Sequence, residues 1–455
     1  MKTTLFIAVS ALALAAAPAT AQTMDHGAMG HEAAPTPPTP ATTPPSKPMD
    51  PNMAGMDHSK MGHGSGHEMA GMSMADPSMP GDGSGTSRLP GNEGGHHGLH
   101  LNPGGGWMLM LHGYATGVYT KQTGPRGDDK GYVQSMAMLT ASHDLGDKAH
   151  LQLRTMMSLE PLMRHDGYPN LFATGEVAYG QPLVDRQHPH DLFMELAAKV
   201  DYDVSDRAKL FLYGGPVGEP ALGPSAFMHR QSAKYNPEAP ITHHWFDSTH
   251  ITYGVVTAGV ATSTLQFEAS AFRGREPDER RFNIETPKLD SWSVRATWNP
   301  SPQWAAQISR GHLKTPEELE PGNENRTTAS VHYASGNGLS AMLAFSAKQK
   351  RPGRTLTAFV GEANWDLSDH HTLFGRIENV RNDELFPDST KPLHDEAFRV
   401  TKFQAGYVYR LKLFGPVNLA LGGSVSAFAK PSALDAAYGR NPMGYTLFTR
   451  ISLGH

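Results

Sequence analysis

Methionine and histidine are concentrated near the start of this 455-residue chain, which contains no cysteine. Thioether sulfur is a soft ligand that prefers Cu(I), whereas imidazole nitrogen also accepts Cu(II), Zn²⁺ and Ni²⁺. Spacings such as Met53-x-x-Met56 and Met61-x-His63 let neighbouring side chains fold round one ion. We therefore predict that this stretch binds copper ions, Cu(I) or Cu(II), without an organic cofactor. The candidate ligands are Met24, His26, Met29, His31, Met49, Met53, Met56, His58, Met61, His63, His67, Met69, Met72, Met74, Met79, His96, His97 and His100.

The segment that carries these ligands has no aromatic residue, isoleucine or valine between about Thr23 and Gly106. It cannot bury enough apolar surface to offset the entropy of ordering, so we predict that residues 22–106 are a disordered metal-binding segment. The alternative is a flexible spacer whose Met and His are incidental, although linkers ordinarily use other residue types. The absence of cysteine fits an oxidising compartment.

The N-terminus has the composition of a secretory signal peptide. Lys2 precedes an apolar run from Leu5 to Ala17, and Ala19-Thr20-Ala21 supplies small residues for cleavage, so residues 1–21 are expected to be removed. No later segment approaches the roughly 18 apolar residues of a membrane-spanning helix. The net charge of −5 gives no basic footprint, and we expect no nucleic-acid partner.

From Trp107 onward the sequence changes to short segments in which apolar and polar residues alternate, as in strands with one buried and one polar face. We predict about sixteen strands and an all-β fold, an up-and-down antiparallel transmembrane β-barrel over residues 107–455. The expected strands are 107–121, 131–143, 149–160, 191–202, 208–214, 249–260, 263–273, 289–298, 303–313, 326–335, 339–348, 355–366, 371–381, 396–411, 416–429 and 444–453.

The connections between these strands alternate in length. Those after the even-numbered strands are short, such as 144–148 and 336–338, and all the others are longer. Outer-membrane barrels have short periplasmic turns and long outer loops, and they close because lipid cannot satisfy an unpaired strand edge. We therefore expect a location in the cell outer membrane with both termini periplasmic. The expected partners are outer-membrane lipid, lipopolysaccharide and the barrel-assembly machinery.

Strand parity also places ligands inside the barrel. In the fourth strand, Leu192, Met194, Leu196, Ala198 and Val200 are expected to face lipid. In the first three expected strands, the side chains on the lumen-facing side include a second set of candidate ligands. They either form a path for metal ions or simply fill the lumen: Met110, His112, Met136, Met138, His150 and Met156. The outer loops add histidines that either bind metal or are solvated or hydrogen-bonded: His165, His188, His190, His229, His243 and His244.

The repeated Met-Asp-His at 24–26 and 56–58, the Met-x-x-Met spacing, the signal peptide and the C-terminal barrel together resemble the outer-membrane copper resistance protein B family. The resemblance implies copper binding through a periplasmic Met/His tail, copper tolerance by sequestration or efflux, and periplasmic copper proteins as partners. Two alternatives remain open: a diffusion porin or solute channel, and a surface adhesion or structural barrel, each with an incidental tail. The sequence contains no Gly-x-Ser-x-Gly, His-Glu-x-x-His or phosphate-binding glycine loop, and we do not expect an enzyme.

Overall fold

The computed structural model describes residues 79–93 and 98–454. Most of the predicted tail ligands lie outside these residues, namely Met24, His26, Met29, His31, Met49, Met53, Met56, His58, Met61, His63, His67, Met69, Met72, Met74, His96 and His97. Within the described residues, no helix is both long and apolar enough to cross a membrane.

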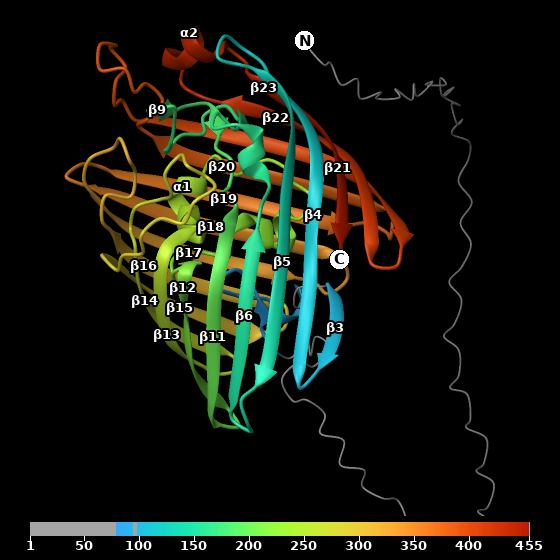
Figure 1. Cartoon of the computed structure of the whole chain (residues 1–455). Coiled ribbons are helices and arrows are strands. Elements are labelled where there is room, and N and C mark those ends of the chain that lie inside the picture. The colour runs from blue at the N-terminus through green and yellow to red at the C-terminus, as the bar shows by residue number, and fades with distance from the viewer. Residues whose placement is uncertain (1–78, 94–97, 455) are drawn as a thin grey trace, which may run out of the picture. The chain divides into compact units, whose positions relative to one another are not determined.

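Long antiparallel strands form a closed barrel (Figure 1), which confirms the predicted fold class. Sixteen of them make the wall, and the six-residue β3 pairs beside the start of the first. Their bounds are β3 (Leu99–Gly104), β4 (Trp107–Gln122), β5 (Asp129–Asp144), β6 (Ala149–Met157), β11 (Phe193–Ser205), β12 (Ala208–Gly218), β13 (Thr252–Ala261), β14 (Leu265–Phe272), β15 (Ser291–Ser301), β16 (Trp304–Leu313), β17 (Asn323–Ala334), β18 (Leu339–Arg351), β19 (Thr355–Asp366), β20 (His371–Asn382), β21 (Phe398–Phe414), β22 (Val417–Ala429) and β23 (Met443–Leu453).

Closure is made by β23, which pairs with the second half of β4, from Gly113 to Gln122. The first residues of β4 extend past the end of β23, and β3 pairs with them instead, Leu99 opposite Leu111. The barrel therefore leaves no long edge of β4 unpaired, as lipid requires.

Burial alternates along the wall strands as the sequence pattern predicted. Outward side chains such as Val133, Leu343 and Leu447 are 58%, 70% and 67% exposed on the isolated chain, whereas Gln134 and Thr446 on the opposite face are buried. The apolar outer face is suited to lipid, and the inner face carries the polar groups that lipid would not accept.

The fourth wall strand departs from the predicted parity at one point. A register shift between Phe193 and Glu195 of β11 places Met194 in the lumen, where it is 1% exposed, although an outward position was predicted. A β-bulge inserts an extra residue into one strand, so the side chains on either side of it change face. The expectation that Met194 faces lipid was therefore wrong.

The connections alternate as predicted, with one exception. The short ones include 145–148, 206–207, 262–264 and 415–416, and all the predicted short turns are present. The exception is 352–354 between β18 and β19, which is short although its position in the alternation predicts a longer loop. β18 extends to Arg351, three residues beyond the predicted end, and so takes up half of the predicted connection 349–354.

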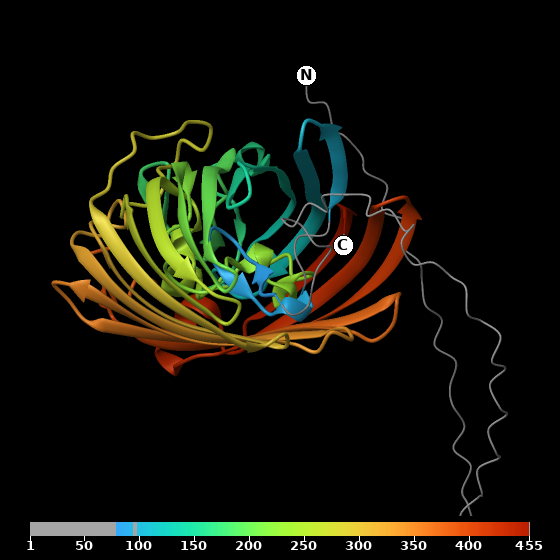
Figure 2. The same cartoon turned by 90° about the horizontal axis from the view of Figure 1, so that it is seen from below.

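The described structure begins before Trp107, the residue at which the barrel was predicted to start. Residues 79–93, here called the N-terminal insert, form β1 (Gly81–Asp82), β2 (Arg88–Leu89) and the 3-10 helix η2 (Gly91–Glu93). They lie inside the ring of strands, in blue in Figure 2. Arg88 donates to the carbonyl of Thr262, and Asn92 donates to those of Ala334 and Pro302. These acceptors belong to short turns or flank them, so the insert fills the short-turn end of the lumen.

Two long connections fill the lumen from the opposite end. The first lumen loop, 158–192, contains η3 (Glu160–Met163), β7 (Tyr168–Pro169), β8 (Glu176–Ala178), β9 (Gln181–Leu183) and β10 (Arg186–Gln187). The second lumen loop, 219–251, contains η4 (Phe227–His229), η5 (Gln231–Ala233), α1 (His243–Phe246) and η6 (Ser248–His250). The last long connection, between β22 and β23, carries η7 (Ser432–Leu434) and α2 (Asp435–Tyr438).

Apolar side chains hold both lumen loops against the wall. Phe172 of the first loop and Trp245 of the second are nearly fully buried in one cluster with wall residues such as Val380 and Val400. Burying an aromatic or large aliphatic side chain stabilises by roughly 1.5–3 kcal/mol. The loops are therefore part of a packed interior and do not lie on the outer surface.

Buried ion pairs fix the position of the second lumen loop. Arg230 donates to Glu362 of β19 at 2.7 Å and to Asp247 of its own loop at 2.9 Å. Lys402 of β21 donates to Glu238 at 2.7 Å. Removing one partner of a buried pair leaves an uncompensated charge, so these contacts specify one arrangement of the loop.

Candidate metal centre in the lumen

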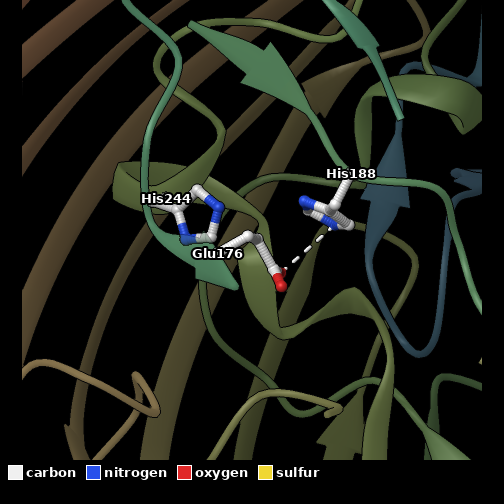
Figure 3. Close-up of side chains that lie close together, drawn as sticks. All are labelled: Glu176, His188 and His244. Carbon is white, nitrogen blue, oxygen red and sulfur yellow. Dashed lines mark ion pairs between the residues drawn. The ribbon is translucent and has the colours of Figure 1, made fainter. Parts of the chain in front are cut away.

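Three side chains with metal-binding atoms meet between the two lumen loops. Glu176 and His188 come from the first loop and His244 from the second, and one ligand atom of each lies within 4.8 Å of the others. Figure 3 shows the three side chains converging, with Nε2 of His188 3.3 Å from Oε1 of Glu176. Two imidazoles and a carboxylate are a donor set suited to Zn²⁺, Cu(II) and related borderline ions.

Short secondary structure positions each of these ligands. Glu176 begins β8, His188 follows β10, and His244 lies in the single turn of α1. Gly175, at φ +106°, lets the backbone approach the His244 ring, because a Cβ there would lie 2.5 Å from Cγ and Nδ1 of that ring. Only a residue without a side chain leaves room for the imidazole in this position.

Charged neighbours orient the ligands. Arg281 donates to Oε2 of Glu176 at 2.9 Å and to Asp191 at 3.3 Å, which leaves Oε1 of Glu176 directed to His188. Nδ1 of His244 lies 3.3 Å from Oε2 of Glu276, but the two atoms form no hydrogen bond. A group that holds the far side of a ligand, as Arg281 holds Glu176, fixes the orientation of that ligand and raises metal affinity.

Burial sets the protonation of the site. Desolvation, together with the positive charge of Arg281 and the neighbouring histidines, holds the pKa of His188 well below its usual value. Desolvation also lowers the pKa of His244 and raises that of Glu176, the latter opposed by Arg281. Both imidazoles are therefore neutral near pH 7, the form that binds metal.

Three further histidines continue this site into one buried cluster. The ring of His243 lies 5.2 Å from that of His244 and 5.2 Å from that of His250, and His250 lies 5.2 Å from His190, measured between centroids. All five histidines are buried inside the barrel. These histidines are not solvated, and the alternative that loop histidines are hydrogen-bonded holds for His190 and His243.

The remaining loop histidines lie outside the cluster. His165 is exposed and its ring contacts Tyr179, whereas His229 is buried in η4. His250 was not among the predicted loop ligands, although it lies in the same run as the His243-His244 pair and follows Asp247 by three residues.

The methionines predicted to line the lumen form one buried cluster. Met110, Met136, Met138 and Met156 pack together with Met194, which the bulge in β11 turns inward. Met138 and Met156 lie directly opposite each other on β5 and β6. Directly opposed Cβ atoms are about 4.5–5.5 Å apart, which is close enough for two thioethers to share an ion.

The other predicted lumen ligands are separated from that cluster to different degrees. His112 pairs with Met138 across β4 and β5 and lines a pocket with Met136. His150 lies instead near the short-turn end, where Nδ1 is 2.6 Å from Asp144 and Nε2 is 3.1 Å from Asp203. Both nitrogens of His150 are engaged by carboxylates, so it does not belong to a sulfur-lined path.

Two candidates from the N-terminal segment lie within the described residues. Met79 is 45% exposed at the start of the N-terminal insert, and His100 is exposed in β3. Neither lies among the buried ligands of the lumen.

A closed antiparallel barrel with an apolar outer face, short turns at one end and a polar, loop-filled lumen defines an outer-membrane β-barrel protein. Comparison with solved structures agrees on the fold. The Salmonella typhi OmpF complex with daunomycin matches with a TM-score of 0.50 and 8% identity, over 77% of this chain and 100% of that chain.

Two further solved structures match less closely. An anion-selective porin from Comamonas acidovorans has a TM-score of 0.48 and 11% identity over 76% of this chain and 100% of that one. The high-pH structure of Pseudomonas putida OprB has a TM-score of 0.48 and 11% identity over 76% and 94%. No family model matches the sequence, and no curated protein matches it.

Proposed function

We propose that this barrel binds copper and contributes to copper tolerance at the outer membrane, by sequestration or efflux, as a non-enzymatic protein with both termini periplasmic. The observation that carries the proposal is the convergence of Glu176, His188 and His244 inside the barrel. The Met/His composition of the N-terminal segment and its resemblance to the copper resistance protein B family support the same function.

The two kinds of ligand divide the task by oxidation state. Thioethers of the tail and of the lumen methionine cluster suit Cu(I), whereas the imidazoles and carboxylate of the lumen site suit Cu(II). Several moderate sites in succession permit movement of an ion, whereas a single tight site would trap it. In this proposal the tail captures periplasmic copper and the lumen ligands receive it.

The test is growth in copper of cells that carry altered chains. Deletion of residues 23–78 removes most tail ligands but leaves the N-terminal insert. The contacts between the insert and the barrel wall are therefore kept. We expect lower copper tolerance with an unchanged amount of heat-modifiable barrel in the outer membrane. Tolerance equal to that of the intact chain would reject the role of the tail.

A second set of variants tests the barrel. Replacing Met136, Met138 and Met156 by Leu keeps apolar volume but removes sulfur, so copper tolerance should fall while Cu(I) binding by the tail persists. If tolerance is unaltered in this variant and also in a Glu176→Gln, His188→Asn variant, the barrel acts as an anchor only.

A solute channel is the second candidate function. It is favoured by a pocket of about 260 Å³ at the short-turn end, lined by charged side chains that include Arg88, Lys199 and Asp201. Polar, charged walls of this kind are typical of a wet lumen. Planar-bilayer conductance tests this function, with a chain that lacks residues 79–93 as the comparison. Steady conductance by the intact chain, with no copper phenotype for the tail deletion, would favour the channel.

A further inference from the structure

Beyond the three-residue site, His190, His243 and His250 form a second group of imidazoles with a common arrangement. Nδ1 of His190 lies 2.9 Å from Oε2 of Glu160. Nδ1 of His243 lies 2.9 Å from Oδ1 of Asp247, and Nδ1 of His250 lies 2.7 Å from the backbone carbonyl of Asp247. Each ring is thus held through the same nitrogen.

These contacts fix the tautomer of all three rings. A carbonyl oxygen only accepts hydrogen bonds, and so does an ionised carboxylate, so Nδ1 carries the proton in each ring. When uncharged, each ring presents an Nε2 lone pair. This is the usual arrangement of a metal-binding histidine, in which a carboxylate or carbonyl holds the other nitrogen. Burial opposes the charged form of His190, but the Glu160 carboxylate raises its pKa overall, so this ring releases a proton when an ion binds.

Two of the Nε2 atoms are buried and find no partner on the protein. Across residues 79–93 and 98–454, no polar group hydrogen-bonds to Nε2 of His190 or of His250. Both side chains are over nine-tenths buried. A buried polar atom of this kind calls for an explanation, and two adjacent lone pairs in a site with no donor are stabilised by a cation.

The spacing of the rings fits a shared ion. With metal–nitrogen bonds of about 2.0–2.1 Å, two imidazoles on one tetrahedral ion have ring centroids about 5 Å apart. The His190–His250 and His243–His250 centroids are each 5.2 Å apart. Among the described residues, only Glu176, His188 and His244 have three ligand atoms within 4.8 Å of one another. The shared ion therefore lies between His190 and His250, whose Nε2 atoms both lack a partner.

A path leads to this group from the short-turn end. One pocket, of about 80 Å³, is lined by Met136, Met228 and the chain end at 452–454. A second, of about 20 Å³, is lined by Met228, Glu160 and His190. The smaller pocket has room for about one water-sized particle. Because Met228 lines both pockets, they adjoin, and a thioether lies between the opening and His190.

We propose that His190 and His250, one from each lumen loop, hold a second ion, a borderline divalent ion such as Cu(II) or Zn²⁺, next to the Glu176–His188–His244 site. Glu160 and Asp247 position its ligands, and the pocket past Met136 and Met228 is its entrance. This inference goes beyond the proposed function, since it concerns the number and place of bound ions and not copper tolerance.

The test counts slowly exchanging ions in the purified full chain. The chain is loaded with Zn²⁺ and washed briefly with a chelator, which removes ions from exposed sites faster than from buried ones, and the retained zinc is measured per chain. His190→Asn with His250→Asn is the matched variant, because the Asn amide keeps a donor near the position of Nδ1 but lacks Nε2. His165→Asn, at an exposed histidine outside the cluster, is the control.

We expect two retained ions in the unaltered chain and in the control, and one in the double variant. The Glu176→Gln, His188→Asn variant should also retain one, and X-ray absorption of that protein should show an imidazole-rich ion. If the His190→Asn, His250→Asn chain retains two ions, the second site is wrong. It is also wrong if the unaltered chain retains one ion and only the Glu176→Gln, His188→Asn variant loses it. Heat-modifiable migration confirms that each variant is folded. Copper tolerance tests the proposed function and the number of retained ions tests the second site, so the failure of one can be told from the failure of the other.

Discussion

Replacing Gly175 by Ala is a direct test of the three-residue site, because this glycine contacts a proposed ligand without being one. A Cβ at this position would lie 2.5 Å from the His244 ring. Ordinary contact begins near 3.4 Å, so the ring or the backbone must move by about 0.9 Å. Metal–ligand distances tolerate only about ±0.2 Å, so His244 leaves its binding position.

The size of the effect follows from two contributions. A non-glycine residue at positive φ costs on the order of 1–3 kcal/mol of folding stability. Displacing a ligand should reduce metal affinity by at least as much as the loss of an orienting neighbour, which is about 10–100-fold. We therefore expect a modest loss of stability together with at least roughly tenfold weaker Zn²⁺ or Cu(II) binding at this site.

Gly180→Ala is the matched control in the same loop. Gly180 also has positive φ, at +70°, but no atom lies within 4 Å of the position of its Cβ. This control carries backbone strain without the clash. Metal affinity is measured by competition with a chromophoric chelator, and stability by thermal unfolding in detergent. If Gly175→Ala and Gly180→Ala bind metal equally well, His244 is not a ligand in this geometry.

Three further predictions concern pH, loop packing and topology. Burial raises the pKa of Glu93 to about 8, because the protonated carboxyl is favoured in the folded chain. The contribution of Glu93 to folding stability is therefore complete below about pH 4.5. As the pH rises through 8, about 4–5 kcal/mol of folding free energy is lost. Glu93→Gln should flatten the fall in thermal stability between pH 6 and 9, and an unchanged slope would contradict this. Arg230→Met leaves Asp247 without its buried cation and should cost about 3–5 kcal/mol, seen as faster proteolysis of the second lumen loop, whereas Arg230→Lys should lose less. A tag at Asp147, in a short turn, should be inaccessible on intact cells and one at Asp388 accessible, and the opposite labelling would reverse the proposed orientation.

The barrel was predictable because its determinants are local. Two-residue alternation and turn length are read within a few residues, and every predicted strand has a counterpart in the structure. Two departures from the predicted strands are also local, but the alternation of apolar and polar residues does not reveal them. The bulge before Glu195 turns Met194 inward, and the extension of β18 to Arg351 shortens one loop.

The lumen site was less predictable because its ligands are far apart in the chain. His188 and His244 were both noted as loop histidines, but nothing in their spacing indicates that they meet, or that Glu176 lies between them. His250 carries no pattern of its own. The lumen methionines were easier, because strand parity alone selects Met136, Met138 and Met156 for one face.

The sequence by itself therefore determined the barrel and its short and long connections, since each depends on neighbouring residues. Only the tertiary structure decided that the long loops fold inward, where buried pairs such as Lys402–Glu238 hold them. That inward fold brings five histidines from two loops into one buried cluster. The physical reason is that loop placement depends on which buried charges and apolar side chains find partners on the wall, and those partners lie more than a hundred residues away.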